Sequence, residues 1–317
     1  MNQSLPLCSE ICALVGPTAA GKSELAMAVA ERAGAQIISL DSMLVYRGMD
    51  IGTAKPDRAM RERVPHHMID LVETDLRYDV QRFLTDLKPV LESIEASGAR
   101  ALFVGGTAFY LKVLTHGIFE GPPADLELRE RLEREALEIG LVEQHARLST
   151  VDPESAGRLH PNDTRRVVRA LEVYEQTGRT LSAWQSEWKD AAGAKSPGHS
   201  RRLVGVGHAV PDLDARILAR THRMLDAGWV EEATRIRAGI GFGPTAIQAL
   251  GYAEILQLAD SEIDREDCTT LIALRTRQFA RKQRTWYRKF EEINWLDGEV
   301  EHDLDRLCAT ALEAFGW

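Results

Sequence analysis

The sequence GPTAAGKS, from Gly16 to Ser23, decides the fold class of this chain. It matches the spacing G-x-x-x-x-G-K-S, in which glycines allow backbone N–H groups to turn toward anionic oxygens. In this pattern Lys22 supplies a positive charge, and the Ser23 hydroxyl is able to ligate Mg²⁺. The N-terminus of a following helix adds a favourable dipole. The motif therefore predicts a bound polyphosphate.

The residues on either side of this loop support that interpretation. Residues 11–15 (ICALV) form an apolar run typical of a buried strand, and residues 24–30 (ELAMAVA) have the composition of a helix. Strand, loop and helix in this order are the context that a phosphate loop requires. The alternative is a glycine-rich turn without a ligand. A dinucleotide-binding fold is not indicated, because the spacing is not G-x-G-x-x-G.

Length and composition predict a globular protein. The 317 residues, of which 44% are hydrophobic, are enough for about two domains. The cysteines form no C-x-x-C pair, so we expect no zinc and a reducing, cytoplasmic compartment. No basic segment precedes residues 5–8 (LPLC), so we expect no export signal. No apolar run approaches the roughly 18 residues that span a membrane, and no membrane partner is expected.

Short apolar runs alternate with helical patterns along most of the chain. Such alternation is typical of an α/β fold with a mostly parallel sheet flanked by helices, here a P-loop NTPase-like core. Between residues 121–123 (GPP) and 196–198 (SPG) the pattern is wholly helical, which predicts an inserted all-helical domain. We expect a core of residues 1–121 and 199–317 and an insertion of residues 122–198. The expected strands are residues 11–15, 36–40, 68–72, 101–104, 203–206 and 293–296.

The charge distribution suggests a nucleic-acid partner, although the net charge of −9 argues against one. Residues 275–289 contain several Arg and Lys residues and no acidic residue. On a helical wheel, Phe279, Trp286 and Phe290 fall within about 40° of one another. We expect this aromatic face to pack and the opposite face to meet phosphate or, alternatively, only solvent. The arginines of that opposite face are Arg277, Arg281, Arg284 and Arg288.

A second basic cluster lies in the predicted insertion. Residues 160–163 (HPND) predict a turn and a helix start, and Arg165, Arg166 and Arg169 follow beside apolar positions. Two basic helices on two domains favour contact with a nucleic acid over a purely solvated face.

Residues directly after strands are further candidates, because ligands of open parallel sheets bind at the carboxyl ends of the strands. Asp41 follows one expected strand, and its carboxylate is able to act as a general base, a hydrogen-bond acceptor or a Mg²⁺ ligand. The alternative is an aspartate that caps the next turn. Gly105 and Gly106 permit close approach of a ligand to the backbone, and Thr107 either meets that ligand or caps a helix.

Two arginines on one predicted helix face complete the candidates. Arg216 and Arg220 are four residues apart and are able to close over phosphates, where they would neutralise charge on a leaving group. The alternative is a face of ordinary ion pairs. His66 and His67 lack the spacing of a helical metal pair, so a structural role is expected for both.

Together these segments resemble the bacterial tRNA dimethylallyltransferases, also called tRNA isopentenyltransferases. The resemblance spans nearly the whole chain and is most specific in residues 41–56 (DSMLVYRGMDIGTAKP), a stretch that kinases and GTPases do not share. It continues through residues 65–67 (PHH), 105–107 (GGT), 160–163 (HPND), 248–252 (QALGY) and the basic helix of residues 275–290.

The resemblance implies transfer of a dimethylallyl group from dimethylallyl diphosphate to N6 of the adenosine immediately 3′ of the anticodon. It also implies Mg²⁺, with Ser23 as its ligand, a tRNA anticodon stem-loop as partner, and a monomer. Asp41, Thr18 and Arg216 become the catalytic residues. The donor-binding residues are Gly16, Pro17, Thr18, Ala19, Ala20, Gly21, Lys22, Ser23 and Arg220. The tRNA-binding residues are Asp41, Ser42, Met43, Leu44, Thr107, Arg129, Arg165, Arg166, Val167, Val168, Arg169, Gln248, Ala249, Leu250, Gly251, Tyr252, Ala253, Arg277, Arg281, Arg284 and Arg288.

Two positions depart from the family pattern, and three other functions compete with it. Ala20 stands where serine is frequent, and Leu44 stands where glutamine is frequent, so Leu44 offers a base only an apolar surface. An adenylate isopentenyltransferase acting on free nucleotides would share the loop and Asp41 but not the insertion. A P-loop small-molecule kinase would leave residues 41–56 unexplained, and a non-catalytic RNA-binding protein would not need Lys22 and Ser23.

Overall fold

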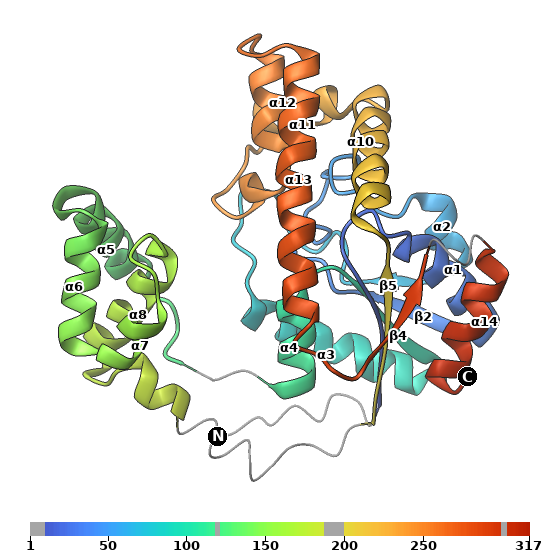
Figure 1. The fold of residues 1–317 in the computed structure, drawn as a ribbon, viewed down its shortest axis with the longest axis horizontal. Coiled ribbons are helices and arrows are strands. Elements are labelled where there is room, and N and C mark those ends of the chain that lie inside the picture. The colour runs from blue at the N-terminus through green and yellow to red at the C-terminus, as the bar shows by residue number, and fades with distance from the viewer. Residues whose placement is uncertain (1–9, 118–120, 187–199, 299–302) are drawn as a thin grey trace. The chain divides into compact units, whose positions relative to one another are not determined.

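The computed structural model describes residues 10–117, 121–186, 200–298 and 303–317. The expectations for residues 5–8 and 196–198 therefore lie outside the described residues. Figure 1 shows the strands and the helices that connect them. The strands are β1 (Glu10–Val15), β2 (Ala35–Ser39), β3 (His66–His67), β4 (Arg100–Gly105), β5 (Ser200–Gly207) and β6 (Ile293–Asp297). The helices are α1 (Lys22–Ala33), α2 (Arg58–Arg63), α3 (Val80–Ala96), α4 (Ala108–His116), α5 (Leu126–Ile139), α6 (Leu141–Val151), α7 (Pro153–Arg158), α8 (Thr164–Thr177), α10 (Val210–Asp226), α11 (Trp229–Ala238), η1 (Ala246–Gln248), α12 (Tyr252–Ala259), α13 (Arg265–Tyr287) and α14 (Leu304–Phe315).

The strands form one sheet in the order β3-β2-β4-β1-β5-β6, and every pairing is parallel. Strand β1 lies between β4 and β5, so the loop that follows it opens at the carboxyl edge in the middle of the sheet. The loops after β2 and β4 open at the same edge, where open α/β sheets bind ligands. The expected parallel α/β architecture is confirmed.

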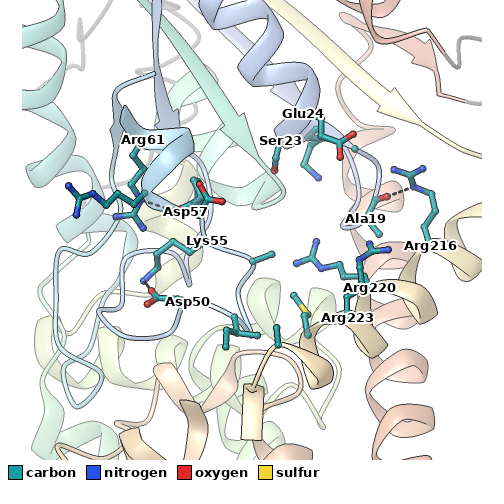
Figure 2. A pocket seen from close by; sticks show the side chains of 18 of the residues that line it. Ala19, Ser23, Glu24, Asp50, Lys55, Asp57, Arg61, Arg216, Arg220 and Arg223 are labelled. Carbon is teal, nitrogen blue, oxygen red and sulfur yellow. Dashed lines mark hydrogen bonds and ion pairs between the residues drawn. The ribbon is translucent and has the colours of Figure 1, made fainter. Parts of the chain in front are cut away.

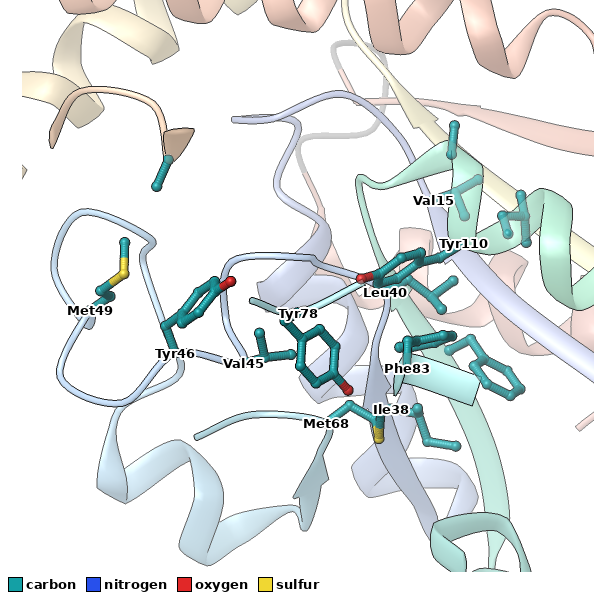
Figure 3. Close-up of a cluster of buried hydrophobic side chains, with 14 of the residues drawn as sticks. Val15, Ile38, Leu40, Val45, Tyr46, Met49, Met68, Tyr78, Phe83 and Tyr110 are labelled. Carbon is teal, nitrogen blue, oxygen red and sulfur yellow. The ribbon is translucent and has the colours of Figure 1, made fainter. Parts of the chain in front are cut away.

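Alternation along the strands produces two apolar layers, because successive side chains point to opposite faces. Ala13 and Val15 belong to one layer with residues of α3 and α4, and Figure 3 shows part of this layer around Tyr46, Tyr78 and Tyr110. Cys12 and Leu14 belong to the other layer with residues of α1 and α14. Both faces of the sheet are thus buried, which explains why its central strands are continuous apolar runs.

The third strand differs from the expectation, which placed it at residues 68–72. Only His66 and His67 pair with β2, and beyond them Val72 makes a single bridge to Tyr46. Met68 has φ of 62° and Asp70 has φ of 54°, and this left-handed backbone breaks an extended strand. The predicted strand over residues 68–72 was wrong, because apolar content without backbone geometry does not make a strand.

The chain divides into two compact units, residues 1–115 with 198–317 and residues 116–197. Helices α5 to α8 make up the described second unit, and residues 181–186 are helical as well. Its core contains Leu132, Leu148, Val168 and Leu171. In the first unit, α10, α11, α12 and α13 stand together (Figure 1). Helix α13 packs against both α10 and α12, which brings the basic segment into the same unit as the phosphate loop.

Candidate active site

The phosphate loop lies between β1 and α1 and has the backbone that its glycines allow. Gly16 has φ of 149°, and a Cβ there would lie 2.5 Å from the Val206 carbonyl oxygen of β5. Gly21 has φ of 84° and precedes the first residue of α1. Ala19 also has a positive φ, of 65°, which is unusual for a residue with a Cβ. The loop is therefore a turn at the N-terminus of α1, the position at which helices bind anions.

A cleft of about 1490 Å³ opens in front of this loop. In Figure 2, Ser23 and the side chains of α10 lie on one side of the cleft, and Lys55 and Asp50 lie on the other. Arg216, Arg220 and Arg223 are spaced at i, i+4 and i+7 along α10, so they share one helix face, and all three line the cleft. Arg216 also donates from Nε to the Ala19 carbonyl oxygen at 2.8 Å.

The electrostatics of the cleft suit an anion. Lys22 donates from Nζ to the Pro17 carbonyl oxygen at 2.6 Å. Burial and the neighbouring charge of Arg220 lower the pKa of Lys22 to about 7, although Asp41 opposes this shift. Burial likewise lowers the pKa of Arg220, with Asp41 again opposing and Arg223 adding to the shift. Crowded cations with lowered pKa values are stabilised when an anion binds beside them.

A smaller pocket of about 130 Å³ adjoins the cleft and contains Asp41. Asp41 lies two residues after the end of β2 and is half-buried. Its Oδ1 accepts a hydrogen bond from the Met43 N–H at 2.8 Å, so the capping alternative is realised by one oxygen. Within the described residues, Oδ2 makes no hydrogen bond. The pocket and the cleft share Lys22, Ser23, Ala54, Pro56 and Arg220 as lining residues.

The loop after β4 supports the Asp41 loop. The Thr107 N–H donates to the Leu40 carbonyl oxygen at 3.0 Å, and Thr107 Oγ1 accepts from the Ser42 N–H at 3.3 Å. Thr107 thus holds the backbone of Ser42, the residue that follows Asp41. A Cβ at Gly105 would overlap the backbone of Leu40, which explains why glycine occupies this position.

The stretch of residues 41–56 is held by a buried lysine. The side chain of Lys55 is inaccessible to solvent. Its Nζ donates to the Tyr46 carbonyl oxygen at 2.6 Å and pairs with Asp50 at 2.8 Å and with Asp70 at 2.6 Å. Arg61 binds the other oxygen of Asp70 at 2.6 Å. Lys55 and Arg61 lower the pKa of Asp70 more than burial raises it, so this network is ionic.

Glu232 of α11 ties the same stretch to the segment of residues 248–252. Its carboxylate is 2% exposed and accepts from the backbone N–H groups of Asp50, Ile51 and Gly52 at 2.8, 2.7 and 3.1 Å. It also accepts from the Tyr252 hydroxyl at 2.6 Å. A Cβ at either Gly52 or Gly251 would overlap the ring of Trp229. The stretch of residues 41–56 and the segment of residues 248–252 therefore meet at the buried ring of Trp229.

Residues 248–253 differ in burial. Gln248 is exposed, whereas Ala249, Gly251 and Tyr252 are buried and Leu250 and Ala253 are half-buried. The buried members shape the segment from inside, so an RNA contact through side chains would involve exposed Gln248 and half-buried Leu250 and Ala253.

Helix α13 differs from the helical-wheel expectation. Phe279 is 39% exposed and lines the small pocket, and Phe290 lies beyond the end of the helix. The buried positions include Ala273, Ala280, Gln283 and Tyr287. The predicted packing face was therefore wrong for Phe279, because residue type alone does not show which aromatic group faces a cavity.

The arginines of α13 also differ among themselves. Arg277 approaches Asp214 of α10 at 3.6 Å, and its Nε is buried. Arg281 and Arg288 are exposed, Arg284 is half-buried, and none of these three makes an ion pair within the described residues.

Of the residues predicted to bind tRNA in the second unit, some are exposed and some are buried. Arg165 and Arg166 are exposed, and Arg166 pairs with Asp163 at 2.8 Å. Val167 and Val168 are each 1% exposed and belong to the core of the unit. Arg129 and Arg169 both bind the fully buried carboxylate of Glu172, at 2.7 and 3.0 Å. Two of the four arginines predicted to bind tRNA in this unit, Arg129 and Arg169, therefore neutralise a buried charge, and this role explains their presence without any contact to RNA.

Several groups of the site were not singled out from the sequence. Arg223 extends the arginine face of α10, and its spacing from Arg220 could have identified it. Gln283 donates to the Gly106 carbonyl oxygen and accepts from the Thr18 N–H, both at 2.8 Å. A glutamine inside a run of basic residues carries no sequence signal for such a contact.

The sequence predicts no zinc and no membrane partner, but it does predict Mg²⁺. Among the described residues, no three His, Cys, Asp or Glu side chains are grouped as a metal site. His66 and His67 bind the Val64 carbonyl oxygen and the Gln36 side chain, at 2.8 and 2.7 Å. No helix in the described part of the chain has the length and apolar character that crossing a bilayer requires.

The fold and the cleft together define an α/β protein of the P-loop class. The chain matches the IPP transferase family over residues 44–290 and the isopentenyl transferase family over residues 9–70. The protein therefore belongs to the IPP transferase family.

Relatives and solved structures agree with this membership. The tRNA dimethylallyltransferase of Geobacter sulfurreducens is 39% identical over 310 residues, which cover 97% of each chain. That of Symbiobacterium thermophilum is 44% identical over 285 residues, covering 90% of this chain and 88% of the relative. The tRNA isopentenylpyrophosphate transferase structure from Bacillus halodurans has a TM-score of 0.66 at 30% identity, covering 98% of this chain and 99% of that one. A eukaryotic dimethylallyltransferase acting on tRNA has a TM-score of 0.79 at 27% identity, covering 95% of this chain and 77% of that one.

Proposed function

We propose that this protein transfers a dimethylallyl group from dimethylallyl diphosphate to tRNA, at N6 of the adenosine immediately 3′ of the anticodon (position 37). The observation that carries the proposal is that the large cleft and the small pocket adjoin each other. The phosphate loop opens on the large cleft, and Asp41 lies in the small pocket that shares Lys22, Ser23 and Arg220 with it. A leaving diphosphate and an incoming base can therefore meet at one carbon atom.

The phosphate loop and α10 would hold the leaving group. As the bond between the allylic carbon and oxygen breaks, its electron pair passes to the diphosphate, whose negative charge must be stabilised. The loop N–H groups, Lys22, Arg216 and Arg220 supply positive charge on the side of the cleft that the phosphate loop and α10 form. An arginine is charged at every physiological pH, so α10 contributes a fixed positive potential.

Asp41 would activate the nucleophile. The lone pair of an exocyclic adenine amine is delocalised into the ring, so the amine attacks carbon weakly until a base accepts its proton. The Met43 N–H holds Oδ1, and Oδ2 remains for the adenine N6 proton. Phe279 is exposed beside the same pocket and offers a ring against which an unstacked base can stack.

The residues present fit Mg²⁺ bound mainly by the ligand. Ser23 is exposed at the start of α1 and lines both hollows, whereas no carboxylate cage faces the loop within the described residues. Mg²⁺ commonly binds through one or two protein oxygens, phosphate oxygens and water. Bound there, the ion would supply positive charge to the diphosphate.

The RNA would be held by exposed basic side chains. Exposed Arg281 and half-buried Arg284 of α13, exposed Arg288 directly after it, and exposed Arg165 and Arg166 of the second unit would each supply positive charge to phosphates of an anticodon stem. Both hollows are lined by residues of the first unit of this chain, so we expect a monomer to be active.

A side-by-side reaction tests this proposal. The purified protein is incubated with Mg²⁺ and dimethylallyl diphosphate, together with either unmodified tRNA or AMP, and the nucleosides are analysed by mass spectrometry. We expect prenylated adenosine at position 37 of the tRNA and none in AMP. Equal modification of AMP would indicate an adenylate isopentenyltransferase and would contradict the tRNA assignment.

A further inference from the structure

Gln283 of α13 connects two loops of the candidate site. Gln283 is 5% exposed, and both polar atoms of its side-chain amide are hydrogen-bonded. Oε1 accepts from the Thr18 N–H of the phosphate loop, and Nε2 donates to the Gly106 carbonyl oxygen after β4, each at 2.8 Å. A buried amide that satisfies two loops at once fixes both relative to its own helix.

Neighbouring contacts hold the same loops against α13. Ala19 packs into a small apolar cluster with Ala280 of α13 and residues of α10. The Tyr287 hydroxyl, one turn after Gln283, donates to the Gly105 carbonyl oxygen at 3.3 Å. A Cβ at Gly106 would overlap Nε2 of Gln283. The fit around Gln283 is therefore close on both sides.

The bond to Thr18 bears directly on anion binding. A phosphate loop works by directing its N–H groups toward the anion, and each peptide that points elsewhere sets the direction of its neighbours. By accepting the Thr18 N–H, Gln283 determines how the following residues of the loop turn toward the cleft. Preorganised donors bind an anion without a reorganisation penalty.

We propose that Gln283 is a positioning residue, which fixes the diphosphate-binding conformation of the phosphate loop from helix α13. This inference rests on the proposed function. Gln283 lies between Arg281 and Arg284 in sequence and borders the small pocket, but its Oε1 and Nε2 are both engaged by backbone groups of the protein and not directed at tRNA phosphates. Its loss should therefore weaken diphosphate binding and leave tRNA binding unchanged.

The test compares Gln283→Met with Gln278→Met. Methionine has a similar length but cannot replace either hydrogen bond, and Gln278 is an exposed glutamine of the same helix. Isothermal titration with magnesium diphosphate should give Gln283→Met a Kd about fivefold or more above that of the wild type, the effect of losing a buried hydrogen bond. Its Kd for tRNA, from filter binding, should be unchanged. Gln278→Met should match the wild type in both measurements.

Gly106→Ala provides a second variant, because the added methyl group would displace the Gln283 amide. Gly106 does not have a left-handed backbone, so alanine can adopt its conformation. This variant should also raise the Kd for diphosphate. Wild-type diphosphate affinity in both variants, or equal weakening of tRNA and diphosphate binding by Gln283→Met, would overturn the inference. Either result, with transfer to tRNA intact in the wild type, would leave the proposed function standing. Absence of transfer by the wild type would refute the proposed function itself.

Discussion

Asp41 combines two roles within one carboxylate. One oxygen caps the turn that follows β2, and the other is available in the small pocket beside Lys22 and Arg220. The capping and catalytic interpretations of this residue are therefore compatible. They are also separable by substitution, because an amide keeps an acceptor oxygen but loses the charge.

Asp41→Asn should lower the turnover rate by about a hundredfold or more, the scale of a lost general base. The asparagine oxygen can still accept the Met43 N–H, so the loop and the affinity for diphosphate should persist. Single-turnover kinetics with dimethylallyl diphosphate and tRNA, with diphosphate titration as the control, measures both properties. An unchanged rate would reduce Asp41 to a cap.

Lys22 makes diphosphate binding dependent on pH. Its pKa of about 7 means that much of the amine is neutral at pH 8 before a ligand binds, whereas a bound anion favours the ammonium form. Binding should therefore take up a proton at Lys22 at pH 8 and little at pH 6, and affinity should fall as pH rises through about 7. Titration calorimetry in buffers of different ionisation enthalpy measures this uptake. In Lys22→Arg the guanidinium stays charged, so the lysine-linked uptake should disappear. Equal uptake by both proteins at pH 8 would refute this assignment.

Helix α13 shows what periodicity can and cannot predict. The sequence indicates a basic helix, and the structure has one over Arg265–Tyr287. The wheel placed Phe279 in the packing face, yet the buried stripe runs through Ala280 and Gln283. A cavity accommodates an exposed aromatic group as readily as a core accommodates a buried one, so only tertiary structure distinguishes these positions.

The arginines of α13 that make no ion pair within the described residues should carry the salt dependence of RNA binding. Arg277 is engaged with Asp214, so the informative double variant is Arg281→Ala with Arg284→Ala. It should weaken tRNA binding and reduce the slope of log K against log salt by about two, one for each lost phosphate contact. Arg265→Ala is the control, because Arg265 begins the same helix and pairs with Asp226. An unaltered slope would show that the basic face is only solvated.

At the scale of the whole molecule, the site is assembled from segments far apart in the chain. The phosphate loop, the strand that precedes it and the candidate residue Asp41 could be predicted, because each depends on a local pattern. Gln283 lies 265 residues from Thr18, and Glu232 lies 182 residues from Asp50. Their roles depend on which segments fold together, which a single sequence does not reveal. Residues 41–56 and 248–252 could be recognised as motifs, but their meeting at Trp229 could not.

In the proposed reaction, the phosphate loop holds a leaving group and not a group that is transferred. Dimethylallyl diphosphate labelled with ¹⁴C in the prenyl group and with ³²P in the diphosphate tests it in one reaction with unmodified tRNA. We expect one ¹⁴C-labelled prenyl group to enter the tRNA for each free diphosphate released, and all ³²P to stay outside the RNA. Incorporation of ³²P into tRNA, or release of labelled diphosphate without ¹⁴C transfer, would contradict it.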